Sequence, residues 1–194
     1  MKIDIYDFDK TIVPFDSGSL FIFYCALHYP WIILYLPVML VAFLLTLAKI
    51  ISFTKFKKIC FMFLPFIPKE RAVKGFWDKY EKQVHTWFKD KPRHAVVISA
   101  SPDFLLKEIG GRLGFDTLIC TRHDARTGAI IGENCRGAEK VRRLYEIFDK
   151  DSIEIIDVYS DSLKHDKHIF ALATNKCYHI VNSKKVPFNY NEKF

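Results

Sequence analysis

The sequence predicts an α/β fold with a parallel sheet, interrupted by an inserted segment that is helical and strongly apolar. Short apolar stretches alternate with amphipathic ones, which is the pattern of strand–helix–strand units. Residues 17–88 break this alternation with long apolar runs. Half of the 194 residues are hydrophobic, which is enough for one domain with a sizeable core and an insert.

The strands are expected at five short, mostly apolar runs, namely Ile3–Phe8, His94–Ser99, Thr117–Cys120, Ser152–Ser160 and Cys177–Val181. Helices are expected between them at Pro102–Leu113, Ala138–Phe148 and about His165–Ala173. We therefore divide the chain into a core, residues 1–16 and 89–194, and an insert, residues 17–88. Ligands of open parallel sheets bind at the carboxyl ends of the strands, so polar residues that follow the strands are the candidates for a site.

The composition restricts the partners. A formal net charge of +7 favours an anionic partner, such as nucleic acid, a phosphorylated metabolite or an acidic membrane. The basic residues do not alternate with aromatic ones as in nucleic-acid-binding modules, so no nucleic acid is expected. The five scattered cysteines include no C-x-x-C pair, which predicts neither disulfides nor zinc and favours a reduced, cytosolic setting. The acidic start is not typical of a secretory signal.

The first strand ends in an Asp-x-Asp-x-Thr pattern formed by Asp7, Asp9 and Thr11. Residues i and i+2 of a strand point the same way, so the two carboxylates could share one pocket. There one carboxylate can attack phosphorus while the other acts as acid and base. By itself the pattern also fits a polar strand end in which Thr11 caps a turn.

A hydroxyl group and an amino group lie at two later boundaries of predicted strands and helices. Ser99 ends the second strand just before a helix, where phosphate can bind, and Ser101 is expected to be the N-cap before Pro102. Lys140 lies in the first turn of a predicted helix, where it could neutralise developing negative charge or be an ordinary solvated lysine.

Two further carboxylates, Asp161 and Asp166, follow the fourth predicted strand. Asp161 is suited to Mg²⁺, which prefers few carboxylates together with waters and a substrate phosphate. The alternative for Asp161 is a simple turn or N-cap aspartate.

Taken in this order, the motifs resemble those of the haloacid dehalogenase (HAD) superfamily, and the resemblance covers the whole α/β part of the chain. The matched residues are Asp7, Asp9 and Thr11, then Ser99, then Lys140, then Asp161 and Asp166. The second acid, two residues after the first, resembles the phosphatases of the superfamily. The Asp-Phe-Asp-Lys-Thr segment is similar to the phosphoserine-phosphatase-like branch (subfamily IB), which inserts a helical cap between the first two motifs.

The resemblance implies a Rossmann-like core, Mg²⁺ as cofactor, and hydrolysis of a phosphomonoester through an aspartyl-phosphate. It implies that Asp7 is the nucleophile and Asp9 the acid and base. The implied phosphate ligands are Thr11, Ser99 and Lys140. The implied metal ligands are Asp7, the backbone carbonyl of Asp9, Asp161, and Asp166 directly or through water.

The insert predicts contact with a membrane. The chain is almost wholly apolar from Leu20 to Ile51, although Pro30 and Pro37 interrupt it. The motifs on either side must meet on one side of a bilayer, which excludes a single crossing. We expect a re-entrant or interfacial hairpin that contacts the membrane through residues 20–67, on the cytoplasmic side of the cell membrane. The alternative is a soluble, cytoplasmic protein. The apolar cap would then be buried against an amphipathic helix over residues 69–91, within a homo-oligomer.

Basic residues within and after this stretch are expected near acidic headgroups, namely Lys49, Lys55, Lys57, Lys58, Lys69 and Arg71. The early apolar stretch and the Tyr159–Ser162 motif are similar to HAD phosphatases of the phosphatidylglycerophosphatase C type. That similarity implies a membrane phospholipid phosphate, such as phosphatidylglycerophosphate, as substrate. A soluble phosphatase of a small metabolite such as phosphoserine, with an apolar dimerising cap, is the alternative.

Two further predictions concern catalysis and the segment Arg122–Gly128, which is expected to form a hairpin flap. A membrane protein that has lost catalysis is disfavoured by the intact motifs. Arg122 and Arg136 lie in or just after a predicted hairpin flap. Either arginine could meet a second phosphate or a glycerol hydroxyl, or be solvated.

Overall fold

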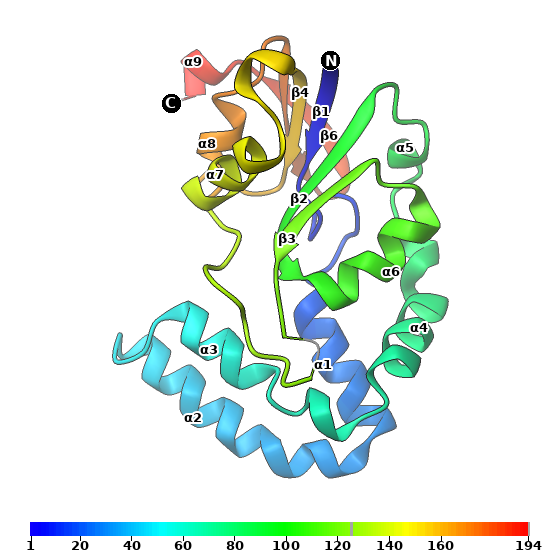
Figure 1. The fold of residues 1–194 in the computed structure, drawn as a ribbon, viewed down its shortest axis with the longest axis vertical. Coiled ribbons are helices and arrows are strands. Elements are labelled where there is room, and N and C mark those ends of the chain that lie inside the picture. Colours follow the sequence, from blue (N-terminus) through cyan, green and yellow to red (C-terminus); the bar gives the residue numbers. More distant parts are fainter. Residues whose placement is uncertain (125, 194) are drawn as a thin grey trace.

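A parallel sheet forms the centre of the molecule (Figure 1). The computed structural model describes residues 1–124 and 126–193. Among these, six strands pair in the order β3-β2-β1-β4-β5-β6. They are β1 (Lys2–Tyr6), β2 (His94–Pro102), β3 (Thr117–Thr121), β4 (Glu154–Ser160), β5 (Lys176–Val181) and β6 (Lys184–Phe188). The first five are parallel, whereas β6 is antiparallel to β5. The predicted α/β fold with a mostly parallel sheet is therefore confirmed.

The order of the strands decides where a site can form. After β1 the chain builds β2 and β3 on one side, and it later returns to build β4 and β5 on the other side. The carboxyl end of β1 is thus the topological switch point, beside which open α/β sheets bind ligands. The five predicted strands are present, and the antiparallel edge strand β6 was not predicted.

Helices cover both faces of the sheet (Figure 1). One buried cluster joins the sheet to α7 (Ala138–Ile147) and α8 (Lys167–Phe170). The other joins it to α6 (Asp103–Leu113), α4 (Lys69–Tyr80) and α5 (Thr86–Lys89). Two short helical segments complete the core, the 3-10 turn η4 (Lys150–Ser152) and α9 (Tyr190–Lys193).

The inserted segment is helical, as expected. It contains α1 (Ser17–His28), α2 (Leu36–Leu47), α3 (Phe53–Cys60), α4 and α5, with 3-10 turns η1 (Pro30–Tyr35), η2 (Leu64–Phe66) and η3 (Glu81–Gln83). Phe21 of α1 and Trp77 of α4 belong to the same buried cluster as Leu105 of α6. Because this cluster runs through both parts of the chain, the division at residues 17 and 88 stays a prediction.

The helix predicted over residues 69–91 is wrong in its length, because α4 ends at Tyr80. A 3-10 turn follows, and Val84 is buried. The N–H of His85 then donates to the carbonyl of Ile12, which lies just after β1. This contact between distant parts of the chain stops a helix whose local sequence would allow it to continue.

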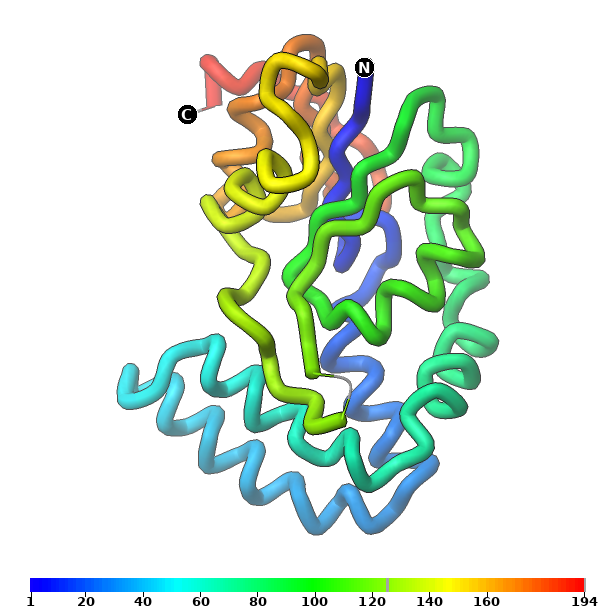
Figure 2. The backbone as a smooth tube through the Cα atoms, in the orientation of Figure 1, coloured from blue at the N-terminus to red at the C-terminus, as the bar shows by residue number. Residues whose placement is uncertain are grey.

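The helices α2 and α3 pack side by side and form a hairpin at the end of the molecule away from both termini (Figure 2). By length and composition, Pro30–Leu47 could cross a membrane, and only 17% of that window is buried. The exposed large apolar side chains of the hairpin and the preceding turn are Trp31, Ile33, Leu34, Leu36, Val38, Leu40, Val41, Phe43, Leu44, Leu47, Ile50 and Phe53. Apolar patches of this extent mark interaction surfaces in soluble domains.

Candidate active site

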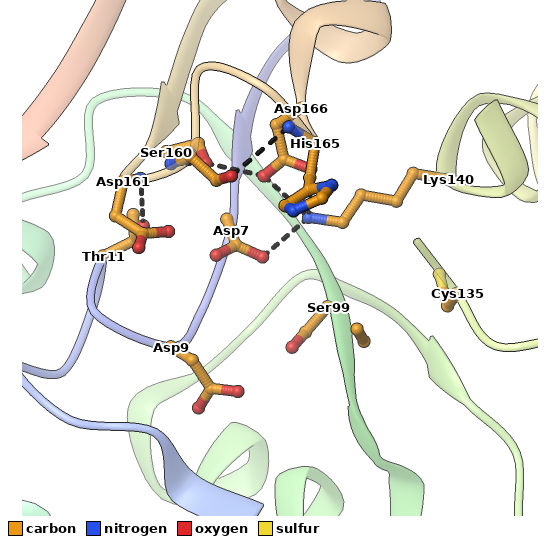
Figure 3. A network of polar contacts seen from close by, with 12 residues as sticks. Asp7, Asp9, Thr11, Ser99, Cys135, Lys140, Ser160, Asp161, His165 and Asp166 are labelled. Atoms are coloured by element: carbon orange, nitrogen blue, oxygen red, sulfur yellow. Dashed lines mark hydrogen bonds and ion pairs between the residues drawn. The ribbon is translucent and has the colours of Figure 1, made fainter. Parts of the chain in front are cut away.

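A cavity of about 340 Å³ lies at the carboxyl ends of β1, β2 and β4. It brings together six of the seven predicted site residues, namely Asp7, Asp9, Ser99, Lys140, Asp161 and Asp166. The exception, Thr11, is buried and does not line the cavity. Figure 3 shows the carboxylates of Asp7 and Asp166 converging on the amine of Lys140.

Asp7 is fixed at the switch point by the sheet itself. It directly follows β1, and its N–H donates to the carbonyl of Tyr159 in β4 at 2.9 Å. The Nζ atom of Lys140 lies 2.7 Å from Oδ1 of Asp7 and 2.9 Å from Oδ2 of Asp166. Ser160 donates a further hydrogen bond of 2.6 Å to the Asp166 carboxylate. The lysine side chain is only 3% exposed, so this is a buried ionic network.

Burial and the oppositely charged neighbours act in opposite directions on the pKa values of Asp7 and Lys140. Burial raises the pKa of Asp7 above its ordinary value, and the neighbouring Lys140 offsets only part of that effect. Burial alone would lower the pKa of Lys140, but the carboxylates of Asp7 and Asp166 outweigh it and raise that pKa. Lys140 therefore carries a firmly held positive charge beside Asp7, where a phosphoryl group would have to be stabilised.

Asp9 is held by partners that the sequence analysis did not assign to it. Its carboxylate accepts a hydrogen bond of 2.8 Å from the N–H of Ser17 and another from the hydroxyl of Ser101. The hydroxyl of Ser17 in turn donates to that of Ser101 at 3.1 Å. The prediction that Ser101 is an N-cap is wrong, because α6 begins after Pro102 without a side-chain cap. Ser101 instead orients the carboxylate of the predicted acid and base.

Ser99 and Thr11 differ in their positions. Ser99 lines the cavity, and its oxygen accepts the N–H of Ser101 at 3.0 Å, which leaves its own proton to donate into the cavity. The Thr11 hydroxyl accepts the N–H of Asp161 at 2.9 Å. The prediction that Thr11 binds the phosphate is therefore corrected: it positions Asp161 instead.

The donor set of the cavity fits Mg²⁺. The carboxylate of Asp161 and the second oxygen of Asp7 accept no hydrogen bond from any other residue that the structure describes. Burial and the nearby Asp166 raise the pKa of Asp161 and outweigh the opposite effect of Lys10 and Lys140, so a further cation would be favourable at this point. Among the described residues no three His, Cys, Asp or Glu side chains are grouped to hold a metal. Two carboxylates with waters and a substrate phosphate are what Mg²⁺ prefers.

The other two predicted metal ligands have different surroundings. The Asp166 carboxylate is already bonded by Lys140 and Ser160, so it supports the site through those contacts. The Asp9 carboxylate is turned to Ser17 and Ser101, which leaves only its backbone carbonyl for a metal, as the resemblance implied.

Residues 5–168 match the haloacid dehalogenase-like hydrolase family. The chain belongs to this family. The prediction of an enzyme of this superfamily is thereby confirmed, and the matched segment contains every predicted site residue from Asp7 to Asp166.

Protein CicA of Caulobacter vibrioides is 38% identical to this HAD-like hydrolase over 94 residues. That match covers 46% of this chain and spans 41% of the length of CicA. It supports a relationship in sequence over part of each protein.

Solved structures share the fold. A Bordetella pertussis Tohama I protein of unknown function aligns with a TM-score of 0.64, at 15% identity over 78% of this chain and 76% of its own. A phosphoserine phosphohydrolase-like protein from Francisella tularensis aligns with a TM-score of 0.57, at 16% identity over 95% and 90%. A phospho-aspartyl intermediate analogue of phosphoserine phosphatase aligns with a TM-score of 0.51, at 17% identity over 89% and 83%. The predicted Rossmann-like core is confirmed.

Three cavity residues of this HAD-like hydrolase were not predicted as a group. Phe53 and Lys57 reach the cavity from α3, one turn apart on the same face of that helix, and Arg136 reaches it from the loop before α7. Lys57 therefore lies in the cavity and not among the basic residues expected at headgroups. The spacing of Phe53 and Lys57 is a helical signal, but nothing in the sequence indicates which face of α3 meets the core. Arg122 is exposed and lines a different cavity.

Proposed function

We propose that the protein hydrolyses a phosphomonoester of a membrane phospholipid, such as phosphatidylglycerophosphate, through an aspartyl-phosphate at Asp7. The observation that carries this proposal is the cavity itself. It joins Asp7, Ser99, Lys140 and Asp161, and it is also lined by Phe53 and Lys57 of α3, the second helix of the hairpin. Membership of the family supports the reaction class, and the exposed apolar hairpin supports the proposed lipid substrate.

In the first step, a carboxylate oxygen of Asp7 attacks phosphorus, and the bond from phosphorus to the ester oxygen breaks. Asp9 donates its proton to that leaving oxygen, which departs as an alcohol. Ser99 and Lys140 hold the transferring phosphoryl group, because this chemistry depends on position and electrostatics. Asp7, the backbone carbonyl of Asp9 and Asp161 would hold Mg²⁺, which would supply neutralisation of the phosphate charge.

In the second step, the Asp9 carboxylate takes a proton from water, and the water oxygen bonds to phosphorus. The bond between phosphorus and Asp7 breaks, which releases inorganic phosphate and restores the carboxylate. The hydrogen bonds from Ser17 and Ser101 keep Asp9 in place through both steps.

A phospholipid fits because of where the apolar surface lies. Leu34 in the turn η1, just before the α2–α3 hairpin, is 82% exposed, and Leu40 of α2 is 59% exposed. A hairpin lying in the interface of a bilayer would bury these side chains and bring the mouth of the cavity to the headgroups. Exposed basic residues of the hairpin and its flanks would contact acidic headgroups, namely Lys49, Lys55, Lys58 and Arg71.

We place the protein on the cytoplasmic side of the membrane. The five cysteines are free thiols and all are buried, which suits a reducing compartment.

A second candidate function is the hydrolysis of a small soluble phosphomonoester such as phosphoserine. It is favoured by the structural likeness to proteins described as phosphoserine phosphatases. In that case a second copy of the chain would cover the apolar hairpin.

A phosphate-release screen separates these functions. The purified protein, with Mg²⁺ or with EDTA, is given phosphatidylglycerophosphate, phosphatidic acid, lysophosphatidic acid, phosphoserine and p-nitrophenyl phosphate. We expect Mg²⁺-dependent release, fastest from a lipid. Preference for phosphoserine would support the second candidate, and no release from any ester would contradict both.

A further inference from the structure

Two cations flank one aromatic ring at the rim of the cavity. The Nζ atom of Lys57 lies 5.5 Å from the centroid of the Phe53 ring, and the Cζ atom of Arg136 lies 5.2 Å from it. All three side chains line the cavity that contains Asp7. The proposed reaction uses none of them.

Arg136 has no polar partner for its side chain. Among the residues that the structure describes, its guanidinium forms no hydrogen bond and no ion pair, and it lies over the ring of Phe53. Arg143, one turn into α7, differs because it bonds two carbonyls and the carboxylate of Glu139. A guanidinium has five N–H donors, and its fork geometry matches phosphate. Arg136 therefore presents an unused anion-binding group to the cavity.

Lys57 is held firmly beside the phosphate-binding residues. Its amine donates to the carbonyl of Ala100 at 3.0 Å and lies 3.4 Å from Oδ1 of Asn134. Ala100 directly follows Ser99, and Asn134 is fixed in turn by a hydrogen bond of 2.9 Å from Thr121. These bonds use part of the donor capacity of the amine and hold its charge near the catalytic carboxylates.

The positive charges of Lys57 and Arg136 repel each other when the cavity holds no anion. Burial lowers the pKa of Lys57, and Arg136 lowers it further, whereas Asp9 and Asp16 act in the opposite direction. An anion placed between Lys57 and Arg136 would relieve this repulsion.

We propose that Lys57 and Arg136 bind a second anionic group of the substrate, a phosphodiester, while Ser99 and Lys140 hold the phosphoryl group that is transferred. The inference rests on the proposed function and narrows its substrate class to phospholipids that carry a phosphodiester as well as a terminal phosphomonoester. In such a lipid the diester lies between the acyl chains and the terminal phosphate. Lys57 correspondingly belongs to the apolar hairpin and lines the same cavity as Asp7.

The test compares two lipids with identical acyl chains in the same detergent micelles, phosphatidylglycerophosphate and phosphatidic acid. Only the first has a phosphodiester. The variants are Arg136→Gln, Arg136→Lys and Lys57→Met, and the matched control is Arg122→Gln, which removes an exposed arginine from a different cavity. Circular dichroism and melting temperature establish that each variant is folded.

We expect the ratio of kcat/KM for phosphatidylglycerophosphate to that for phosphatidic acid to fall about tenfold or more in Arg136→Gln and in Lys57→Met. The loss should appear mainly in KM, and Arg136→Lys should recover part of it. Arg122→Gln should keep the ratio of the unmodified protein. A ratio that changes less than about twofold in both variants, or that falls equally in the control, would overturn the inference.

The failure of the proposed function has a different signature. If the unmodified protein releases no phosphate from p-nitrophenyl phosphate or from either lipid, the catalytic proposal itself fails. If it hydrolyses both lipids with equal kcat/KM, the catalytic proposal stands and the second-anion site is wrong.

Discussion

The Nζ atom of Lys140 lies 2.7 Å from Oδ1 of Asp7, although 133 positions separate them in the chain. The same lysine contacts Asp166, so one cation joins two carboxylates at the carboxyl end of the sheet. A similar arrangement lies further towards the amino ends of the strands, where Arg93, just before β2, joins Asp4 of β1 and Asp157 of β4. The first group lines the cavity and the second does not, so their removal should have different effects.

Replacing Lys140 by Met should lower both activity and stability. The variant leaves Asp7 and Asp166 buried without a counter-charge, so we expect a loss of about 3–5 kcal/mol in the free energy of unfolding. Loss of charge stabilisation should reduce kcat on p-nitrophenyl phosphate about a hundredfold or more. The control is Lys107→Met, because Lys107 is 72% exposed and its pair with Asp103 is worth little. Unchanged kcat in Lys140→Met would contradict its role.

Replacing Arg93 by Met should lower stability alone. Asp4 is fully buried and accepts a bond of 2.8 Å from Arg93, so urea unfolding should report a loss of about 3–5 kcal/mol. Below the unfolding transition, KM for p-nitrophenyl phosphate should stay within about twofold of the unmodified value. A large change in KM would mean that this end of the sheet contributes to the site.

Replacing Asp7 by Asn should abolish turnover and leave the protein folded. The amide is not a nucleophile, and it removes a charge that burial disfavours. Phosphate release and thermal unfolding are measured together. The exposed Asp90→Asn is the control and should retain activity. Measurable hydrolysis by Asp7→Asn would remove the assignment of the nucleophile.

Stability should fall in acid partly because of Glu139. Hydrogen bonds from Arg142, and further contacts with Arg143, lower the pKa of Glu139 from 4.5 to about 2. This stabilisation is fully present above pH 4.5 and is lost as the pH falls towards 2, because the folded state must then bind a proton at an unfavourable site. The free energy of unfolding should therefore decrease less between pH 7 and pH 3 in Glu139→Gln than in the unmodified protein. Glu154→Gln, at an exposed position, should behave like the unmodified protein.

A charge on the apolar hairpin should weaken binding to membranes. Leu44 of α2 is 54% exposed, and Ile147 of α7, outside the hairpin, is 52% exposed. We expect Leu44→Glu to reduce co-sedimentation with anionic phospholipid vesicles about tenfold, whereas Ile147→Glu has little effect. Equal binding by both variants would support a hairpin that serves a soluble dimer instead.

Much of the fold could be predicted because the signals are local. Each parallel strand is a short apolar run, and the candidates Asp7 and Asp161 directly follow two of them. The strand β6 escaped prediction because Lys184–Phe188 contains two lysines and a proline, which leaves only Val186 and Phe188 as apolar residues. Such a sequence is tolerated at an antiparallel sheet edge, where Pro187 does not have to donate within a central ladder.

The misassigned site residues depend on distant contacts. Next to Pro102, Ser101 has the local pattern of an N-cap, yet its hydroxyl bonds Asp9, 92 positions away. Thr11 was expected at the phosphate, yet it bonds the N–H of Asp161, 150 positions away. Lys57 lies in a run of lysines whose outward and inward members differ only in the packing of α3. Spacing within one segment carries no information about these pairings.

In the proposed function, the helix α3 serves both membrane attachment and substrate selectivity, which constrains how this enzyme could change. Its eight residues, Phe53–Cys60, belong to the apolar hairpin and also supply Phe53 and Lys57 to the cavity. Under the proposed function, a substitution that tilts this helix would therefore alter both the depth of the protein in a bilayer and the set of esters that it accepts. Homologues that adopt a water-soluble substrate would have to rebuild both properties together, so we expect changes in α2 and at positions 53 and 57 to occur jointly.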